Sequence, residues 1–339
     1  MRTLIWGAGA IGGTLGAYAL RAGRELTFVD VDEDHVAAIR AHGLHVTGPV
    51  DDFTVPARAL LPNEVTGEWD AILLCTKALH TEAAVRALTP HLAEDGFVVS
   101  VQNGLNEFVI AEHVGHERTL GAFVNFGADY LEPGVIHFGG RGAVVVGELD
   151  GRASERLDWL LELMRTFEPG AEATRDIWSY LWGKMGYGAM LFASALTNDS
   201  IADVLAAREA RPILDALARE VLAVAAAEGV TPRGFNGFDP AAFGPSGSDA
   251  ARDASYRAME AHNRGSAKTH SGVWRDLAVR KRKTEVDAQF GPILERAEAH
   301  GIPVPTTRRM VDLVHDVETG RRPQDWATLM ALSPQSDPA

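Results

Sequence analysis

The chain has 339 residues but only one cysteine, Cys75. A single cysteine excludes an internal disulfide and a multi-cysteine zinc site, and it suits a reducing compartment such as the cytoplasm. The other residue types that bind metals are scattered along the chain rather than spaced as a ligand set. His113 and His116 are close in sequence, but we expect them on a solvated turn. We therefore predict no metal site.

Positive charge and long apolar runs are also lacking. Asp and Glu number 46 against 32 Lys and Arg, which gives a net charge of -14. Such an acidic chain is a poor candidate for a nucleic-acid groove or an anionic membrane surface. No run of about 18 uncharged apolar residues occurs, so no membrane span is predicted. The apolar N-terminus carries a single Arg2 and is broken by glycines, unlike a signal peptide.

The apolar content is sufficient for two domains. Hydrophobic residues make up 46% of a chain that is longer than one ordinary domain. In the first part, apolar strands alternate with helical patterns. The expected strands are 3–6, 25–32, 69–78 and 96–104. The expected helices between them are 12–23, 33–43 and 80–93. This alternation predicts an α/β domain with a Rossmann-type doubly wound parallel sheet.

The second part of the chain has a different pattern. After about residue 176 it is almost wholly helical, except for a Gly-, Pro- and Ser-rich stretch at 231–255 that we expect to be a connecting loop. We predict a dinucleotide-binding domain over 1–174, an all-helical substrate and catalytic domain over 175–330, and a tail over 331–339. The apolar helices of the second domain are compatible with a homodimer.

The first helix begins in a glycine motif that indicates a bound dinucleotide. Gly7, Gly9 and Gly12 have the G-x-G-x-x-G spacing, directly after a strand and directly before a helix. The first glycine permits a tight turn, the second lets the backbone approach a pyrophosphate, and the third lets the helix lie close to the sheet. The helix N-terminus at Ala10 and Ile11 offers free N–H groups to the phosphates. The alternative is a glycine turn without a ligand.

An acidic residue ends the second expected strand. Asp30 is placed to accept hydrogen bonds from the adenosine ribose hydroxyls. A 2'-phosphate would meet this acid, and no Lys or Arg lies between Asp30 and Arg40. We therefore predict NAD as the cofactor, with NADP as the alternative. Under that alternative Asp30 only caps the next helix, and a basic residue such as Arg24 reaches the phosphate.

Two polar side chains follow two other strands. Lys77 comes just after the third strand, and Asn103 just after the fourth. The carboxyl ends of parallel strands are where ligands bind in such folds. We expect Lys77 near the cofactor and Asn103 near the nicotinamide ribose or a substrate hydroxyl. The alternative is that each caps the following turn.

The helical domain contains the candidate acid–base groups. Lys184 is the only charged residue between Asp176 and Asp199. Desolvation there would lower the pKa of Lys184, which suits a general acid for a ketone oxygen. The alternative is a lysine that reaches the surface. Glu285 is a candidate to fix the substrate or to orient Lys184. The alternative is an ordinary solvated glutamate. Ser271 is a candidate to bind a carboxylate or hydroxyl.

Together these segments resemble the ketopantoate reductase family. "GAGAIG", "CTKA", "QNG", "WGK" and a late Ser…Asp…Thr-Glu helix occur in the order that is usual there, over roughly residues 1–313. The resemblance implies a Rossmann domain followed by a helical domain, and hydride transfer from a nicotinamide cofactor to a 2-oxo acid. It also implies Lys184 as the general acid, Glu285 as a residue that assists substrate binding and catalysis, and Ser271 as a substrate ligand.

The sequence also departs from the family pattern. Gly188 and Phe192 occupy the positions, four and eight residues after Lys184, where the family usually has asparagines. The usual cofactor of the family is NADPH, whereas the acidic side chain of Asp30 disfavours a 2'-phosphate. Loss of groups that bind a substrate hydroxyl can change specificity by orders of magnitude. We therefore expect a different carbonyl substrate, with more room at Gly188 and a more apolar wall at Phe192.

The resulting prediction is an NAD(P)-dependent oxidoreductase acting on CH–OH groups, with a small-molecule carbonyl or hydroxy substrate. Two alternatives use the same scaffold. One is an NAD-dependent dehydrogenase of an alcohol or sugar derivative. The other is a non-catalytic redox sensor, which would need the dinucleotide site but not Lys184. The sequence leaves the substrate, its stereochemistry and the direction of flux open.

Overall fold

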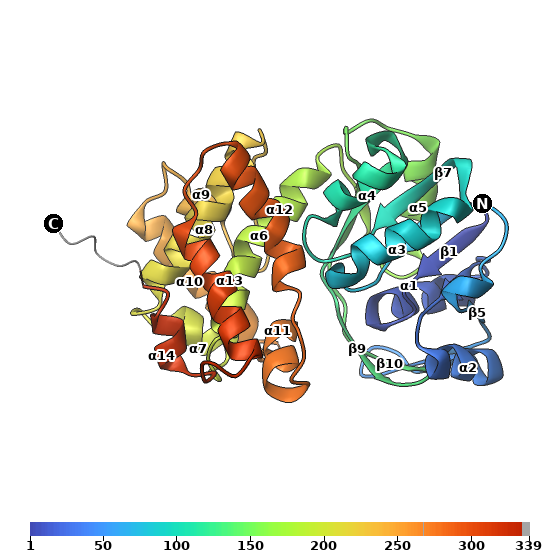
Figure 1. The fold of residues 1–339 in the computed structure, drawn as a ribbon, viewed down its shortest axis with the longest axis horizontal. Coiled ribbons are helices and arrows are strands. Elements are labelled where there is room, and N and C mark those ends of the chain that lie inside the picture. The colour runs from blue at the N-terminus through green and yellow to red at the C-terminus, as the bar shows by residue number, and fades with distance from the viewer. Residues whose placement is uncertain (267, 334–339) are drawn as a thin grey trace. The chain divides into compact units, whose positions relative to one another are not determined.

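A computed structural model describes residues 1–266 and 268–333 of the chain. The chain forms two compact units, Met1–Ile177 and Trp178–Ala339 (Figure 1). The division therefore falls a few residues after the boundary expected at 174. Residues 334–339 of the expected tail lie outside the described part.

The first unit is built on an eight-stranded sheet with the order β12-β11-β8-β7-β6-β1-β2-β5. Neighbouring strands pair in parallel except β11, which is antiparallel to β8. Strand β1 lies between β2 and β6. The chain continues first through β2 and β5 on one side of β1, and then through β6, β7 and β8 on the other. The predicted Rossmann-type doubly wound sheet is confirmed. Its strands are β1 Thr3–Trp6, β2 Thr27–Val29, β5 Arg58–Leu60, β6 Trp69–Leu74, β7 Leu92–Ser100, β8 Thr119–Val124, β11 Val144–Glu148 and β12 Glu172–Ala173.

Both faces of this sheet are buried, which explains why its strands are almost continuously apolar. In β1, Ile5 belongs to one core, while Leu4 and Trp6 belong to the other. Helices α1, α2 and α5 contribute to the first core, and α3 and α4 to the second. These helices are α1 Ala10–Arg21, α2 Glu33–His42, α3 Thr81–Leu88, α4 Asn106–Val114 and α5 Glu155–Arg165.

A second, four-stranded sheet covers α1 on its other side. Its order is β4-β3-β10-β9. Helix α1 lies so close to it that a Cβ at Gly13 would be 2.1 Å from Cδ1 of Ile136 in β10. The strands are β3 Leu44–Thr47, β4 Phe53–Val55, β9 Gly127–Glu132 and β10 Val135–Gly140.

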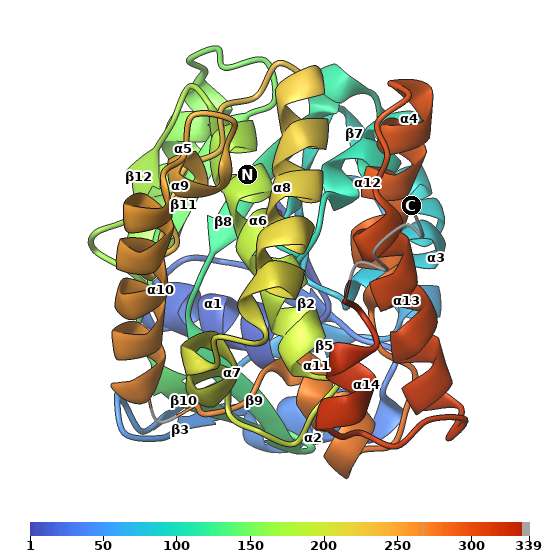
Figure 2. The same ribbon diagram turned by 90° about the vertical axis from the view of Figure 1, so that its left-hand side faces the viewer.

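The second unit is built from helices, as expected. Figure 2 shows α8 running between α10 and α13. The helices are α6 Ile177–Ser194, α7 Ile201–Ala206, α8 Arg211–Ala227, α9 Pro240–Phe243, α10 Asp249–Arg264, α11 Gly272–Trp274, α12 Val286–Ala299, α13 Pro305–Glu318 and α14 Trp326–Met330. No helix in the described part of the chain is both long and apolar enough to cross a membrane.

Two expectations for the second unit are wrong in detail. The stretch 231–255 is not one connecting loop, because α9 lies within it and α10 begins at Asp249. Asp239 and Ser248 cap these helices by accepting backbone hydrogen bonds from Ala241 and Ala251. The helical pattern after residue 271 is also interrupted, since the basic residues 280–283 form a loop before α12.

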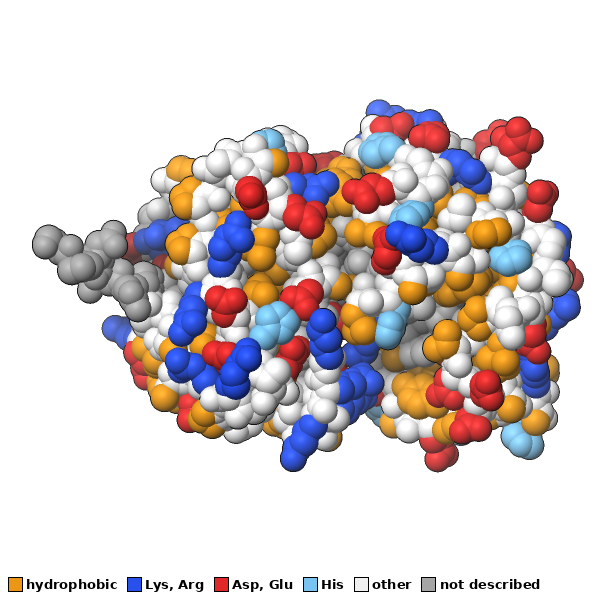
Figure 3. All heavy atoms as spheres, viewed as in Figure 1, with side chains coloured by type: hydrophobic (Ala, Val, Ile, Leu, Met, Phe, Trp, Pro, Cys, Tyr) orange, Lys and Arg blue, Asp and Glu red, His pale blue; other side chains and the backbone are white. Residues whose placement is uncertain are grey.

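Acidic and basic side chains are interspersed on the face of the molecule shown in Figure 3. Ion pairs also form within the second unit. Arg264 pairs with Glu260 at 2.8 Å on α10, and Lys283 pairs with Asp287 at 3.0 Å at the start of α12. Exposed pairs of this kind each contribute about 0–1 kcal/mol, so their main effect is on local geometry.

Candidate active site

The three motif glycines have three different surroundings. Gly7 has a φ of +104°, and a Cβ there would lie 2.7 Å from the backbone nitrogen of Thr76. A Cβ at Gly12 would lie 2.0 Å from the carbonyl oxygen of Gly7. At Gly9 a Cβ would meet nothing within 4 Å. The first and third glycines are therefore required by the fold, whereas the second leaves space that suits an approaching pyrophosphate.

Asp30 is held against this glycine loop. Its carboxylate accepts hydrogen bonds from the backbone N–H of Ala8, at 2.7 Å, and of Asp32, at 3.1 Å. The exposed residue Val31 follows it. Arg24 precedes β2 and Asp30 follows it, so the strand separates these two side chains. Neither of the two residues that follow Asp30, Val31 and Asp32, is basic.

Buried His35 also supports the loop. Its Nε2 lies 2.9 Å from the carbonyl oxygen of Ala8, and its Nδ1 lies 2.9 Å from the backbone nitrogen of Gly134. These contacts assign the proton to Nε2 and tie the glycine loop to the turn between β9 and β10. Sequence reasoning did not find this role, because an isolated histidine carries no signal of its backbone partners.

Lys77 and Asn103 lie at the same edge of the sheet as Gly7. Strands β1, β6 and β7 are parallel neighbours, so their carboxyl ends meet. Half-buried Lys77 follows β6, and exposed Asn103 follows β7. The structure therefore brings together the three loops that the sequence placed at the ligand edge.

A buried polar network joins two of these loops. Gln102 donates from Nε2 to the carbonyl oxygen of Thr76 and to Oγ1 of Thr81, both at 2.9 Å. Oγ1 of Thr81 donates to Oδ1 of Asn106 at 2.9 Å. Nδ2 of Asn106 in turn donates to the carbonyl oxygen of Asn103 at 2.6 Å. The network fixes the backbone beside Lys77 relative to Asn103. Thr81 and Asn106 were missed, since each resembles an ordinary first residue of a helix.

In the second unit, Lys184 lies on the partly exposed stripe of α6. Most of this helix is buried, but Tyr180, Lys184, Gly188 and Leu191 are half-buried and share one face. A Cβ at Gly188 would meet nothing within 4 Å. Close packing occurs instead at Gly186, where a Cβ would lie 3.2 Å from the ring of Phe238.

Phe192 does not share this stripe. It is only 3% exposed, and its ring lies 5.0 Å from that of Phe290 in an edge-to-face contact. This contact joins α6 to α12. The structure thus places Gly188, but not Phe192, on the exposed face beside Lys184.

Ser271 and Glu285 lie at the starts of two helices. Ser271 is buried and caps α11, where its Oγ accepts a hydrogen bond from the backbone N–H of Trp274 at 3.2 Å. Half-buried Glu285 directly precedes α12. Between them, buried Asp276 accepts from Nε of Arg282 at 2.8 Å and so shapes the basic loop 280–283.

Comparison with known families decides the assignment of the chain. The model of the ketopantoate reductase PanE/ApbA domain matches residues 3–151, and that of its C-terminal domain matches residues 174–318. The chain belongs to the ketopantoate reductase family. The expected resemblance is confirmed, and with it an NAD(P)-dependent oxidoreductase at the level of the family.

Individual ketopantoate reductases are similar to this chain over almost their whole length. The 2-dehydropantoate 2-reductase of Halobacterium salinarum is 29% identical over 323 residues, which cover 93% of this chain and 98% of that protein. The solved PanE/ApbA family ketopantoate reductase of Ralstonia eutropha JMP134 has a TM-score of 0.77 and 27% identity, covering 95% of this chain and 99% of that one. A structure of D-mandelate dehydrogenase with NADH and anilino(oxo)acetate has a TM-score of 0.81 and 22% identity, covering 94% and 99%.

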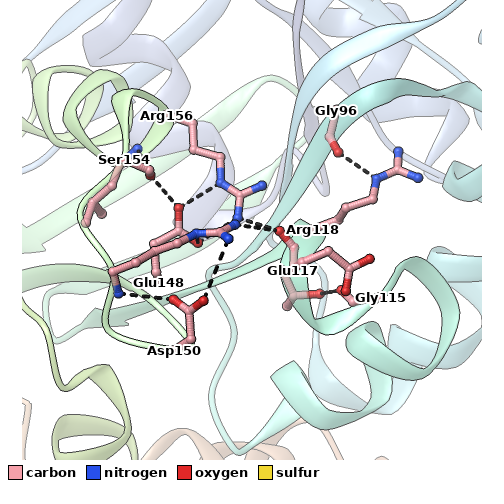
Figure 4. Close-up of polar contacts among 11 residues, drawn as sticks. Gly96, Gly115, Glu117, Arg118, Glu148, Asp150, Ser154 and Arg156 are labelled. Carbon is pink, nitrogen blue, oxygen red and sulfur yellow. Dashed lines mark hydrogen bonds and ion pairs between the residues drawn. The ribbon is translucent and has the colours of Figure 1, made fainter.

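A cluster of charges at the opposite edge of the sheet has a structural explanation. Arg156 binds both carboxylate oxygens of buried Glu148, at 2.7 and 2.6 Å, and Ser154 donates to the same group (Figure 4). Glu148 pairs with Leu120 at the start of β8, away from the carboxyl edge that carries Asn103. The cluster therefore fixes the turn between β11 and α5 rather than forming part of the ligand edge.

Proposed function

We propose that this ketopantoate reductase family member transfers hydride between NAD(P)H and a 2-oxo acid or related ketone, with Lys184 as the general acid. The observation that carries the proposal is the position of Lys184. It is the only charged residue in α6, and it lies on the helix's half-buried stripe. An ammonium group beside an apolar helix is well placed to give its proton to a carbonyl oxygen.

The first unit provides the cofactor site in this proposal. Gly7, Gly9, Ala10, Ile11 and Gly12 hold the pyrophosphate at the start of α1, where Gly9 leaves room for it. Lys77 and Asn103 bind nearer the nicotinamide, since they share this edge of the sheet. A bound nicotinamide supplies the hydride. The protein's part is to orient it and to supply the proton.

NAD is the proposed cofactor, with NADP as the alternative. The carboxylate of Asp30 is fixed by two backbone N–H groups, and exposed Val31 and Asp32 follow it. A 2'-phosphate at that place would meet negative charge without a neighbouring cation in sequence. The ribose hydroxyls of NAD can instead donate to the carboxylate.

The substrate is proposed to differ from ketopantoate. Asn103 and Ser271 remain as binders of a hydroxyl or carboxylate, and Glu285 assists binding and catalysis. The open space at Gly188 leaves room for a larger group beside Lys184. Phe192 acts on the site only indirectly, through the ring contact with Phe290 that packs α6 on α12.

The match to the ketopantoate reductase family does not favour the two alternative functions. These were an NAD-dependent alcohol or sugar-derivative dehydrogenase on the same scaffold, and a redox sensor that binds dinucleotide without turnover. We also propose that the protein works in the cytoplasm on a small molecule. A homodimer stays a prediction that light scattering can check.

The experiment that tests the proposal measures oxidation of NADH and NADPH with ketopantoate and with bulkier or less polar 2-oxo acids. We expect faster turnover with NADH and a higher kcat/KM for one of the bulkier substrates. Turnover of ketopantoate that matches or exceeds every other substrate would contradict the substrate proposal. Tighter binding of NADPH than of NADH would contradict the cofactor proposal, and binding without any turnover would favour the sensor.

A further inference from the structure

The residue before Glu285 is anchored to the end of another helix. Thr284 is buried, and both its backbone nitrogen and its Oγ1 contact Oε1 of Glu318, at 2.7 and 2.6 Å. Glu318 is the last residue of α13. The same Oγ1 accepts a hydrogen bond from the backbone N–H of Val286 at 3.3 Å. One carboxylate thus holds the chain immediately around Glu285.

His315 extends this anchor to the other side of Glu285. Its Nδ1 lies 2.9 Å from Oε2 of Glu318, and its Nε2 lies 2.8 Å from Oδ1 of Asp287. Lys283 contacts the second oxygen of Asp287 at 3.0 Å. Residues 283, 284 and 287 are therefore all tied into one network, and Glu285 lies within that segment.

We propose that His315 is a positioning residue for Glu285, because it bridges Asp287 and Glu318 and so clamps the start of α12 to the end of α13. The inference rests on the proposed function of Glu285. A side chain used in catalysis must be held in a narrow range of positions. Glu285 lies between the basic loop 280–283 and the start of α12. Without such a clamp, the position of its backbone would be set only by that loop.

The charge state of His315 decides how complete the clamp is. Burial alone would lower the pKa of His315, but the hydrogen bonds to Glu318 and Asp287 outweigh it and raise the pKa above 6.5. Burial alone would likewise raise the pKa of Asp287, but Lys283 and His315 lower it. The imidazolium donates from both nitrogens, whereas neutral imidazole can donate from only one.

The direction of the pH effect follows from the raised pKa. The clamp is fully formed below about 6.5 and weakens as the pH rises through the folded-state pKa of His315. The charged groups in this network are Lys283, Asp287 and Glu318. Helix α8, which also packs on α13, contacts its other end, where Glu220 binds Thr307.

The test compares His315→Gln with a matched control, His300→Gln. His300 also contacts a carboxylate, since its Nε2 lies 2.7 Å from Oε1 of Glu228, but it follows the far end of α12. We expect His315→Gln to lower kcat/KM at pH 6 by roughly 10- to 100-fold without changing NADH affinity. The deficit should shrink as the pH rises, because wild-type His315 then loses the proton that lets both ring nitrogens donate. His300→Gln should match the wild type throughout.

Further variants keep the outcome interpretable. If His315→Gln does not fold, Thr284→Val should lower kcat/KM while Thr284→Ser retains it. A turnover in Glu285→Gln that equals the wild type would refute the role of Glu285 itself. If Glu285→Gln loses turnover while His315→Gln and Thr284→Val behave like His300→Gln, the clamp is refuted. The proposed role of Glu285 is then retained. Titration of the His315 ring by NMR, with a pKa at or below 6.5, would also refute it.

Discussion

At the scale of single residues, the glycines of one motif have different surroundings. Gly12 is excluded from carrying a side chain by the carbonyl oxygen of Gly7, which a Cβ would approach to 2.0 Å. Gly9 has no such restriction. The two glycines look equivalent in the sequence. The structure shows that a side chain would clash at Gly12 but not at Gly9.

Alanine substitutions should distinguish these requirements. Gly12→Ala should lower the free energy of unfolding by about 1–3 kcal/mol or more, since the added methyl group overpacks the contact between α1 and β1. Gly9→Ala should keep stability within about 0.5 kcal/mol but weaken NADH binding, because its methyl group occupies the free space. Urea unfolding and fluorescence titration measure the two effects. Unchanged NADH affinity in Gly9→Ala would show that the pyrophosphate does not approach there.

At the scale of elements, the sequence predicted strands β1, β2, β6 and β7 of the first sheet. It did not predict the four-stranded sheet or the interruptions in the helical unit. Strands such as β1 and β6 are short, apolar and bounded by glycine or polar residues, so composition alone identifies them. The loop expected over 231–255 is wrong because that expectation rests on the Gly, Pro and Ser content of the stretch. Its helices are set instead by single capping residues, Asp239 and Ser248.

Helix α6 shows a similar limit. Periodicity indicates a helix around Lys184, but it does not show which face is exposed when nearly every residue is apolar. The structure places Gly188 on the same stripe and Phe192 in the packing against Phe290. A substitution at Gly188 therefore changes the surroundings of Lys184 directly.

Gly188→Asn should be accommodated and should alter selectivity. Nothing lies within 4 Å of its Cβ position, so the fold should be retained. The amide adds a hydrogen-bonding group beside Lys184, and we expect the kcat/KM ratio of ketopantoate to a bulkier 2-oxo acid to rise by about tenfold or more. Gly186→Ala is the control, because it contacts Phe238 and should change stability rather than this ratio. An unchanged ratio in Gly188→Asn would place substrate recognition elsewhere.

At the scale of the whole molecule, the two units divide the predicted residues between them. Gly7, Asp30, Lys77 and Asn103 belong to the first unit, and all four lie at the carboxyl edge of one sheet. The sequence could predict this because strand order and direction determine that edge. Lys184, Gly188, Ser271 and Glu285 belong to the helical unit.

The sequence could not predict the side chains that hold these residues in place. Thr81 and Asn106 contact each other and His315 contacts Asp287, and in each pair the partners are distant in sequence. Each lies in an ordinary helical pattern, and its role depends on which helices or loops become neighbours. Such supporting residues become visible only when the fold has brought their partners together.

The most direct test of the account is turnover by Lys184→Ala, measured with NADH and the best substrate of the panel, beside NADH affinity. Removal of a general acid should lower kcat by about 100-fold or more, since such groups contribute roughly 10²–10⁴-fold. NADH affinity should stay at the wild-type value, because the cofactor residues belong to the first unit. A kcat within a few-fold of the wild type would contradict the assignment of Lys184 as the proton donor.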